Sequence, residues 1–177
     1  MEAITLYLVF AMFATLWLDV TRYTIPNWLV GSLLVLYPLT VTLSPAAVDW
    51  KMALAAMGVV FAVGCIIFAL RVMGGGDIKL ITVLALWVGW QGLLDFILLF
   101  AILGGVFSVF VLLGRKLQPY IPLKGKTPKL FQKNAPIPYG VAIAGAFLWL
   151  ITLPTLALMV NPNSLSTMAH AAAKYLF

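Results

Sequence analysis

Long apolar runs, each close to the length of a membrane-crossing helix, make up most of this chain of 177 residues. Hydrophobic residues account for 64% of the sequence and charged residues for only 9%, whereas a soluble domain usually carries about 25% charged residues. A helix needs roughly 20 mostly apolar residues to cross a bilayer. The sequence therefore predicts an all-α, polytopic integral membrane protein, folded as a single domain over residues 1–177.

Polar and helix-breaking residues divide the apolar runs into about six expected transmembrane helices. Pro26 and Asn27 suit the start of a helix after the first break, and three consecutive glycines at 74–76 cannot easily continue one. Residues 89–92 (Gly-Trp-Gln-Gly) indicate a turn at the membrane interface with an aromatic anchor. The expected helices cover residues 3–19, 27–43, 52–72, 78–90, 93–113 and 137–160.

Basic residues are divided unequally between the two sides of the membrane that six helices define. One side receives nine Lys and Arg residues, six of them in the loop 114–136, and the other side receives two. Because the basic side of a membrane protein faces the cytoplasm, we expect 114–136 to be a cytoplasmic loop and 161–177 an extracytoplasmic tail. The net charge of +6 is then a mark of the cytoplasmic side rather than of a nucleic-acid partner. The basic loop is either a solvated determinant of topology or a contact for anionic membrane lipid.

Two of the five acidic residues, Asp19 and Asp77, fall beside membrane helices on the predicted cytoplasmic side. A carboxylate at membrane depth is costly and is commonly functional. Two carboxylates in one site cannot both ionise cheaply, so the pair is expected to share one proton. The ionised member can then take a proton from a water that attacks a peptide carbonyl, while the protonated member donates to the carbonyl oxygen.

Other catalytic chemistries lack the residues that they require. The only histidine, His170, lies in the predicted outward tail, which excludes a Ser-His dyad within the membrane and an H-E-x-x-H zinc motif. The single cysteine, Cys65, belongs to no C-x-x-C pair. A paired-aspartate mechanism needs neither metal nor cofactor, and we expect none.

Three segments around and beyond the aspartates resemble those of a known family. Residues 74–79 read G-G-G-D-I-K, which resembles the G-x-G-D signature of intramembrane aspartyl proteases, and among these the type IV prepilin peptidases. Asp19 is followed by I-P-N at 25–27, and P-Y-G at 138–140 opens the last expected helix, as in that family. The short Tad/Cpa-type members, which mature Flp-type pilins, are the most similar, although archaeal preflagellin peptidases share the aspartate pattern.

The resemblance implies an aspartic endopeptidase with Asp19 and Asp77 as its catalytic pair. The implied substrate is a prepilin or pseudopilin, cut after its leader at the cytoplasmic face of the bacterial inner membrane. Larger members carry an added cytoplasmic segment, often with paired cysteines, and also methylate the new N-terminus. The chain lacks these features, so we expect neither N-methyltransferase activity nor a zinc site. The implied supporting or substrate-site residues are Gly74, Gly75, Gly76, Lys79, Pro138, Tyr139 and Gly140.

Each aspartate also has a structural interpretation, and two other functions stay open. Asp77 is placed to cap the helix that follows it, and Asp19 to pair with Arg22 at the headgroup level. A small transporter would carry acids along the depth of the bundle, yet the middles of the second, third and sixth expected helices contain none. A non-catalytic membrane subunit of a pilus or secretion assembly is the remaining alternative to the peptidase.

Overall fold

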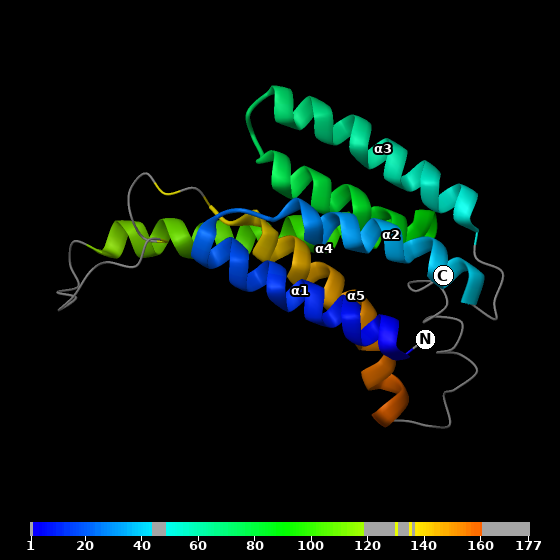
Figure 1. The fold of residues 1–177 in the computed structure, drawn as a ribbon. Coiled ribbons are helices and arrows are strands. Elements are labelled where there is room, and N and C mark those ends of the chain that lie inside the picture. Colours follow the sequence, from blue (N-terminus) through cyan, green and yellow to red (C-terminus); the bar gives the residue numbers. More distant parts are fainter. Residues whose placement is uncertain (1, 44–48, 119–129, 131–134, 136, 161–177) are drawn as a thin grey trace.

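The computed structural model describes residues 2–43, 49–118, 130, 135 and 137–160, and in this part of the chain all the regular elements are helical. Figure 1 shows a bundle of long helices that run alongside one another. The all-α prediction is confirmed. The helices are α1 (Glu2–Arg22), α2 (Asn27–Leu43), α3 (Trp50–Ala69), α4 (Gly75–Leu117) and α5 (Tyr139–Val160).

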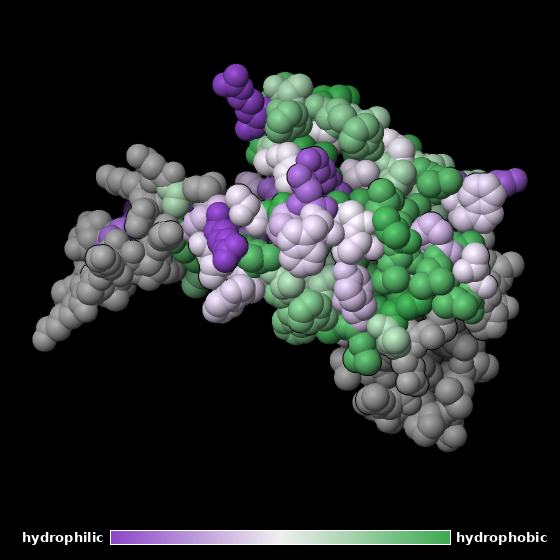
Figure 2. All heavy atoms as spheres, viewed as in Figure 1, coloured by the Kyte–Doolittle hydropathy of each residue, from purple (hydrophilic) through white to green (hydrophobic). Residues whose placement is uncertain are grey.

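The surface of the bundle is that of a membrane protein. Within the described residues α1, α3 and α4 are long and apolar enough to cross a membrane, and α2 and residues 139–152 of α5 form shorter apolar helices. Large hydrophobic side chains are exposed on the outside, such as Trp17 at 71% and Val35 at 77%. Figure 2 shows hydrophobic residues over much of one face, with hydrophilic ones mainly toward the end where α1 stops and α5 starts. An exterior of this kind is stable in lipid rather than in water.

A break at Gly89 divides α4 into two membrane segments, 75–88 and 90–117. Gly89 has φ 70° and ψ −179°, a backbone conformation that only glycine adopts without strain. The second segment runs back along the bundle, because Asp77 near one end of α4 and Arg115 near the other line the same cleft. The six expected helices therefore correspond to six helical segments. The predicted four-residue turn at 89–92 is wrong in extent, since the helix resumes at Trp90.

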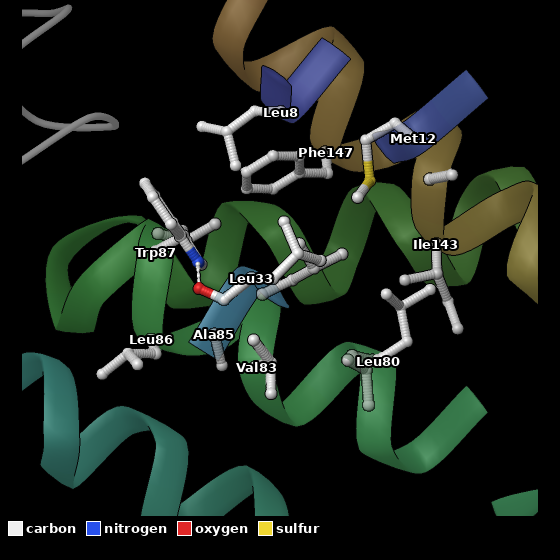
Figure 3. Close-up of a cluster of buried hydrophobic side chains, with 14 of the residues drawn as sticks. Leu8, Met12, Leu33, Leu80, Val83, Ala85, Leu86, Trp87, Ile143 and Phe147 are labelled. Atoms are coloured by element: carbon white, nitrogen blue, oxygen red, sulfur yellow. Dashed lines mark hydrogen bonds between the residues drawn. The ribbon is translucent and has the colours of Figure 1, made fainter. Parts of the chain in front are cut away.

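The first segment of α4 is the centre of the bundle. Every residue from Leu80 to Val88 is buried, as expected for a helix that is apolar on all sides and surrounded by others. Figure 3 shows this segment beside Leu8 and Met12 of α1, Leu33 of α2, and Ile143 and Phe147 of α5. Its Trp87 Nε1 donates a hydrogen bond of 3.1 Å to the Leu33 carbonyl. Because other helices surround this segment, its length does not have to match the thickness of the bilayer, and a short helix is tolerated.

Several sequence predictions concern residues outside the described part of the chain. These are most of the basic loop 114–136, of which the structure describes 114–118, 130 and 135, and the whole tail 161–177.

Candidate active site

A cleft of about 1170 Å³ opens at one end of the bundle, where the end of α1, the start of α4 and the approach to α5 meet. Both candidate catalytic residues, Asp19 and Asp77, line it. The supporting residues that the resemblance implied also line it, except Gly140, which lies directly beneath Asp19. Residues separated by more than 100 positions in the sequence are thus brought together by packing.

Asp19 lies in the last turn of α1, with its side chain only 4% exposed. The helix ends at Arg22, three residues beyond the predicted end, because Tyr23 adopts a left-handed φ of 54° and donates its backbone N–H to the Asp19 carbonyl at 3.0 Å. Asp19 is buried whereas Arg22 is exposed, so the alternative that placed Asp19 at the headgroup level, paired with Arg22, does not fit the structure. The Asp19 carboxylate instead lies in the wall of the cleft, beside the start of α5.

Asp77 occupies the third position of α4, after Gly74 as the N-cap. Its carboxylate approaches the backbone N–H of Gly74, which is the backward contact that an acid makes in a capping box. Asp77 therefore helps to cap α4, although it is not the N-cap residue. Asp77 also lies close enough to Asp19 for the two carboxylates to interact electrostatically. The same side chain therefore caps α4 and belongs to the carboxylate pair.

The N-terminus of α5 points at both carboxylates. The backbone amides of Gly140 and Val141 approach Asp19, and the Gly140 amide also approaches Asp77. First-turn amides of a helix have no partner within the helix and carry partial positive charge. They form a ready-made site for negative charge. Pro138 precedes this turn, and the missing N–H of a proline costs nothing there.

One carboxylate oxygen is left over in this arrangement. Asp19 Oδ2 is buried and has no hydrogen-bond partner of ordinary geometry among the described residues. An unpaired buried carboxylate oxygen costs free energy of about 1–3 kcal/mol or more. Such an atom is suited to accept a proton or a hydrogen bond from a reactant that enters the cleft.

The glycines before Asp77 act mainly through close packing. Gly74 alone is extended, with φ −69° and ψ 147°, whereas Gly75 and Gly76 already belong to the first turn of α4. The predicted unwound stretch is thus wrong for two of the three glycines. A Cβ on Gly76 would lie 3.5 Å from the Ile25 Cβ, and one on Gly74 would lie 3.1 Å from Asp77 Oδ2. Small residues here let the α1–α2 connection and the carboxylate approach the backbone.

The I-P-N segment joins the start of α2 to the start of α4. Lys79 Nζ donates a hydrogen bond of 3.1 Å to Asn27 Oδ1, and both residues line the cleft. Ile25 is buried at 9% exposure and touches the positions where side chains on Gly76 and Gly140 would lie. Ile25 thus lies between the start of α4 and the start of α5.

Sequence reasoning missed several residues of this cleft, three of which carry a guanidinium or a phenol. Arg71 and Arg115 were interpreted only as markers of membrane orientation, and Tyr23 was not singled out. All three line the cleft, and the Tyr23 hydroxyl is buried without a hydrogen-bond partner in the described part of the chain. The sequence did place these residues at the same membrane face as Asp19 and Asp77. That shared position could have indicated that they lie near the carboxylates.

The cleft offers acid–base chemistry through its carboxylates. The described residues contain no group of three or more His, Cys, Asp or Glu side chains placed to hold a metal ion. Two carboxylates on separate helices, with helix-terminal amides beside them, can activate a water and stabilise developing negative charge. An arrangement of this kind is compatible with carboxylate-dependent hydrolysis inside a membrane bundle.

Comparison with known proteins identifies the family. A model of the type IV leader peptidase family matches residues 6–109, more than half of the chain, and this protein belongs to that family. Two curated relatives from Aeromonas salmonicida, one of them from strain A449, carry the name prepilin leader peptidase/N-methyltransferase. Each is 36% identical over 81 residues, which cover 44% of this chain and 23% of the relative. No solved structure matches the chain.

Proposed function

We propose that this protein is an aspartic endopeptidase that removes the leader of a type IV prepilin or pseudopilin. The observation that carries the proposal is the meeting of Asp19 and Asp77, from two different helices, in one cleft against the N-terminus of α5. The family and the name of the curated relatives supply the substrate class. The relatives are also named as methyltransferases, and methylation is not part of the proposal.

In this proposal the two carboxylates share one proton and divide the work of acid and base. The ionised carboxylate takes a proton from a bound water, whose oxygen attacks the scissile carbonyl carbon, while the other carboxyl donates its proton to the carbonyl oxygen. Collapse of the tetrahedral intermediate breaks the C–N bond. The leaving amine receives a proton from one carboxyl, and one hydroxyl of the intermediate returns its proton to the other carboxylate, which restores the shared proton. Either aspartate can begin as the acid, since the two titrate as a unit.

The amides of Gly140 and Val141 support this chemistry from the start of α5. Their fixed dipoles lie beside Asp19, and the Gly140 amide lies beside both carboxylates. Dipoles that are already oriented stabilise charge without reorganisation at the moment of reaction. The apolar exterior around the cleft suits a substrate whose hydrophobic helix stays in the lipid while its leader junction enters the cleft.

We expect the cleft to open to the cytoplasm at the bacterial inner membrane, and the substrate to be a pilin of the Flp type. Arg71, Lys79 and Arg115 lie at the cleft end, whereas Lys51 lies at the opposite end of α3. Basic residues favour the cytoplasmic side. The resemblance to Tad/Cpa-type peptidases supports the choice of pilin.

The function is tested by a processing assay. This protein is expressed with a Flp-type prepilin in bacterial cells that lack their own prepilin peptidase. The expected result is a shortened pilin whose new N-terminus, read by mass spectrometry, follows the leader. Full-length prepilin as the sole product, with this protein intact and folded in the membrane, would contradict the proposal.

Membrane orientation makes a separate prediction. In a Cys65→Ala background, which removes an exposed thiol, a cysteine at Lys116 is expected to react with an impermeant maleimide only after the inner membrane is permeabilised. A cysteine at Lys51 is expected to react in intact spheroplasts. A cysteine at Gly125, which lies outside the described residues, should behave as Lys116 does. Labelling of Lys116→Cys from outside would reverse the proposed orientation.

A further inference from the structure

The guanidinium of Arg115 holds the segment that leads into α5. Arg115 lies in the last turn of α4 and is half-buried. Its Nε and Nη2 donate to the Leu130 carbonyl at 3.2 and 3.1 Å, and Nη2 also donates to the Ala135 carbonyl at 2.7 Å. One side chain thus binds two backbone carbonyls that lie 15 and 20 positions further along the chain.

The held segment is short and ends at the carboxylates. Ala135 is five positions before Gly140, whose amide approaches both Asp19 and Asp77. Between them Pro138 is buried and restricts the backbone because its φ is fixed. Because Ala135 is only five positions from Gly140 and Pro138 limits the backbone between them, we expect a shift at Ala135 to reach the first turn of α5.

The residue type suits this task. A guanidinium is planar, always charged, and presents several donors in a fixed fork, whereas a lysine ammonium is a single compact charge on a flexible stem. The fork holds two carbonyls in a fixed geometry, which an ammonium on a flexible stem does less well. A cation in the last turn of a helix is also favoured by the helix dipole. Lys116, the next residue, carries the same charge but is exposed.

We propose that Arg115 is a positioning residue for the peptidase reaction. It fixes the carbonyls of Leu130 and Ala135 so that the α5 amides stay beside the aspartate pair. This inference rests on the proposed function, because it concerns the same cleft. Since misplacement of reacting groups by about 1 Å can cost about 100-fold in rate, loosening this attachment is expected to lower turnover without removing any reacting group.

The test compares Arg115→Lys, Arg115→Met and Lys116→Met in detergent-solubilised protein, with a synthetic prepilin peptide as substrate. We expect Arg115→Met to lower kcat by about 10- to 100-fold while KM changes by less than about 3-fold, because the proposed effect is on the position of the α5 amides beside the reacting carboxylates. Arg115→Lys should recover part of the activity. Lys116→Met removes a charge from the same turn and should match the wild type, which separates the hydrogen bonds from the contribution of charge.

Hydrogen–deuterium exchange gives a readout that does not depend on activity. Peptides covering residues 137–142 are expected to exchange faster in Arg115→Met than in the wild type or in Lys116→Met. Wild-type kcat together with unchanged exchange in Arg115→Met would overturn the positioning role, as would an equal loss in both methionine variants. If the wild type itself does not cleave the peptide, the proposed function fails, and the exchange comparison still decides whether Arg115 holds the segment.

Discussion

Asp19→Asn and Asp77→Asn are each expected to abolish leader cleavage, with a loss of at least about 10³-fold in the processing rate. Removing one member of a catalytic unit costs nearly as much as removing the whole unit. Asparagine keeps the shape of each side chain but cannot exchange a proton with water, so either variant removes half of the acid–base pair. The rate is measured by prepilin processing in cells and by peptide cleavage in detergent.

The carboxylate Asp49 provides a matched control. Asp49 caps α3, where its Oδ1 accepts from the Met52 backbone N–H at 3.2 Å, and it does not line the cleft. Asp49→Asn retains a good N-cap residue and should process prepilin at the wild-type rate. Size-exclusion profiles and thermal unfolding check that all three variants are folded. If a folded Asp19 or Asp77 variant processes prepilin at more than about a tenth of the wild-type rate, its residual activity is too high for a paired-acid mechanism.

The parts of this structure that sequence reasoning predicts are those fixed by local patterns. The lengths of the apolar runs give the number of helices. Because successive helices cross the membrane in alternating directions, Asp19, Asp77 and the P-Y-G segment at 138–140 are all placed at one membrane face. Gly89 also marks the reversal within α4, because its φ of 70° requires a glycine. In each case one residue type or one run of residues carries the information.

The rest depends on contacts between distant residues, which no local pattern contains. The burial of Leu80 to Val88 on all sides distinguishes a central helix from a lipid-facing one, although both are equally apolar in sequence. Gly75 and Gly76 form the first turn of α4 with Phe68 and Ile25 close to them, despite the weak helix propensity of glycine. In the sequence Arg115 looks like one more basic residue that marks the cytoplasmic side. Its hydrogen bonds to the carbonyls of Leu130 and Ala135 are visible only in the folded chain.

Gly140→Ala is expected to lower peptide cleavage by about 100-fold, because the new methyl group would displace the carboxylate that the reaction needs. An ideal Cβ at this position lies 2.7 Å from Asp19 Oδ2, 2.9 Å from Asp19 Cγ and 3.1 Å from Ile25 Cδ1. Contacts under 3 Å cannot persist, so a group must move. The carboxyl of Asp19 is the movable end of a side chain, and its displacement separates it from the α5 amides and from Asp77.

Gly145→Ala on the same helix is the control for this substitution. A Cβ there would meet only Leu103 Cδ1, at 3.6 Å, which is ordinary contact. Gly145→Ala exchanges glycine for a better helix former, worth about 1 kcal/mol in a helix interior, so this variant should be at least as well folded as the parent. In Gly140→Ala the atoms that must move belong mainly to the Asp19 side chain, so we expect that variant to keep its fold. We expect Gly145→Ala to cleave at the wild-type rate and Gly140→Ala to lose activity while its thermal stability is retained.

Equal activity of the two variants would mean that the close approach of α5 to Asp19 does not matter for cleavage. Loss of folding in Gly140→Ala alone would instead show that the start of α5 is held there by packing.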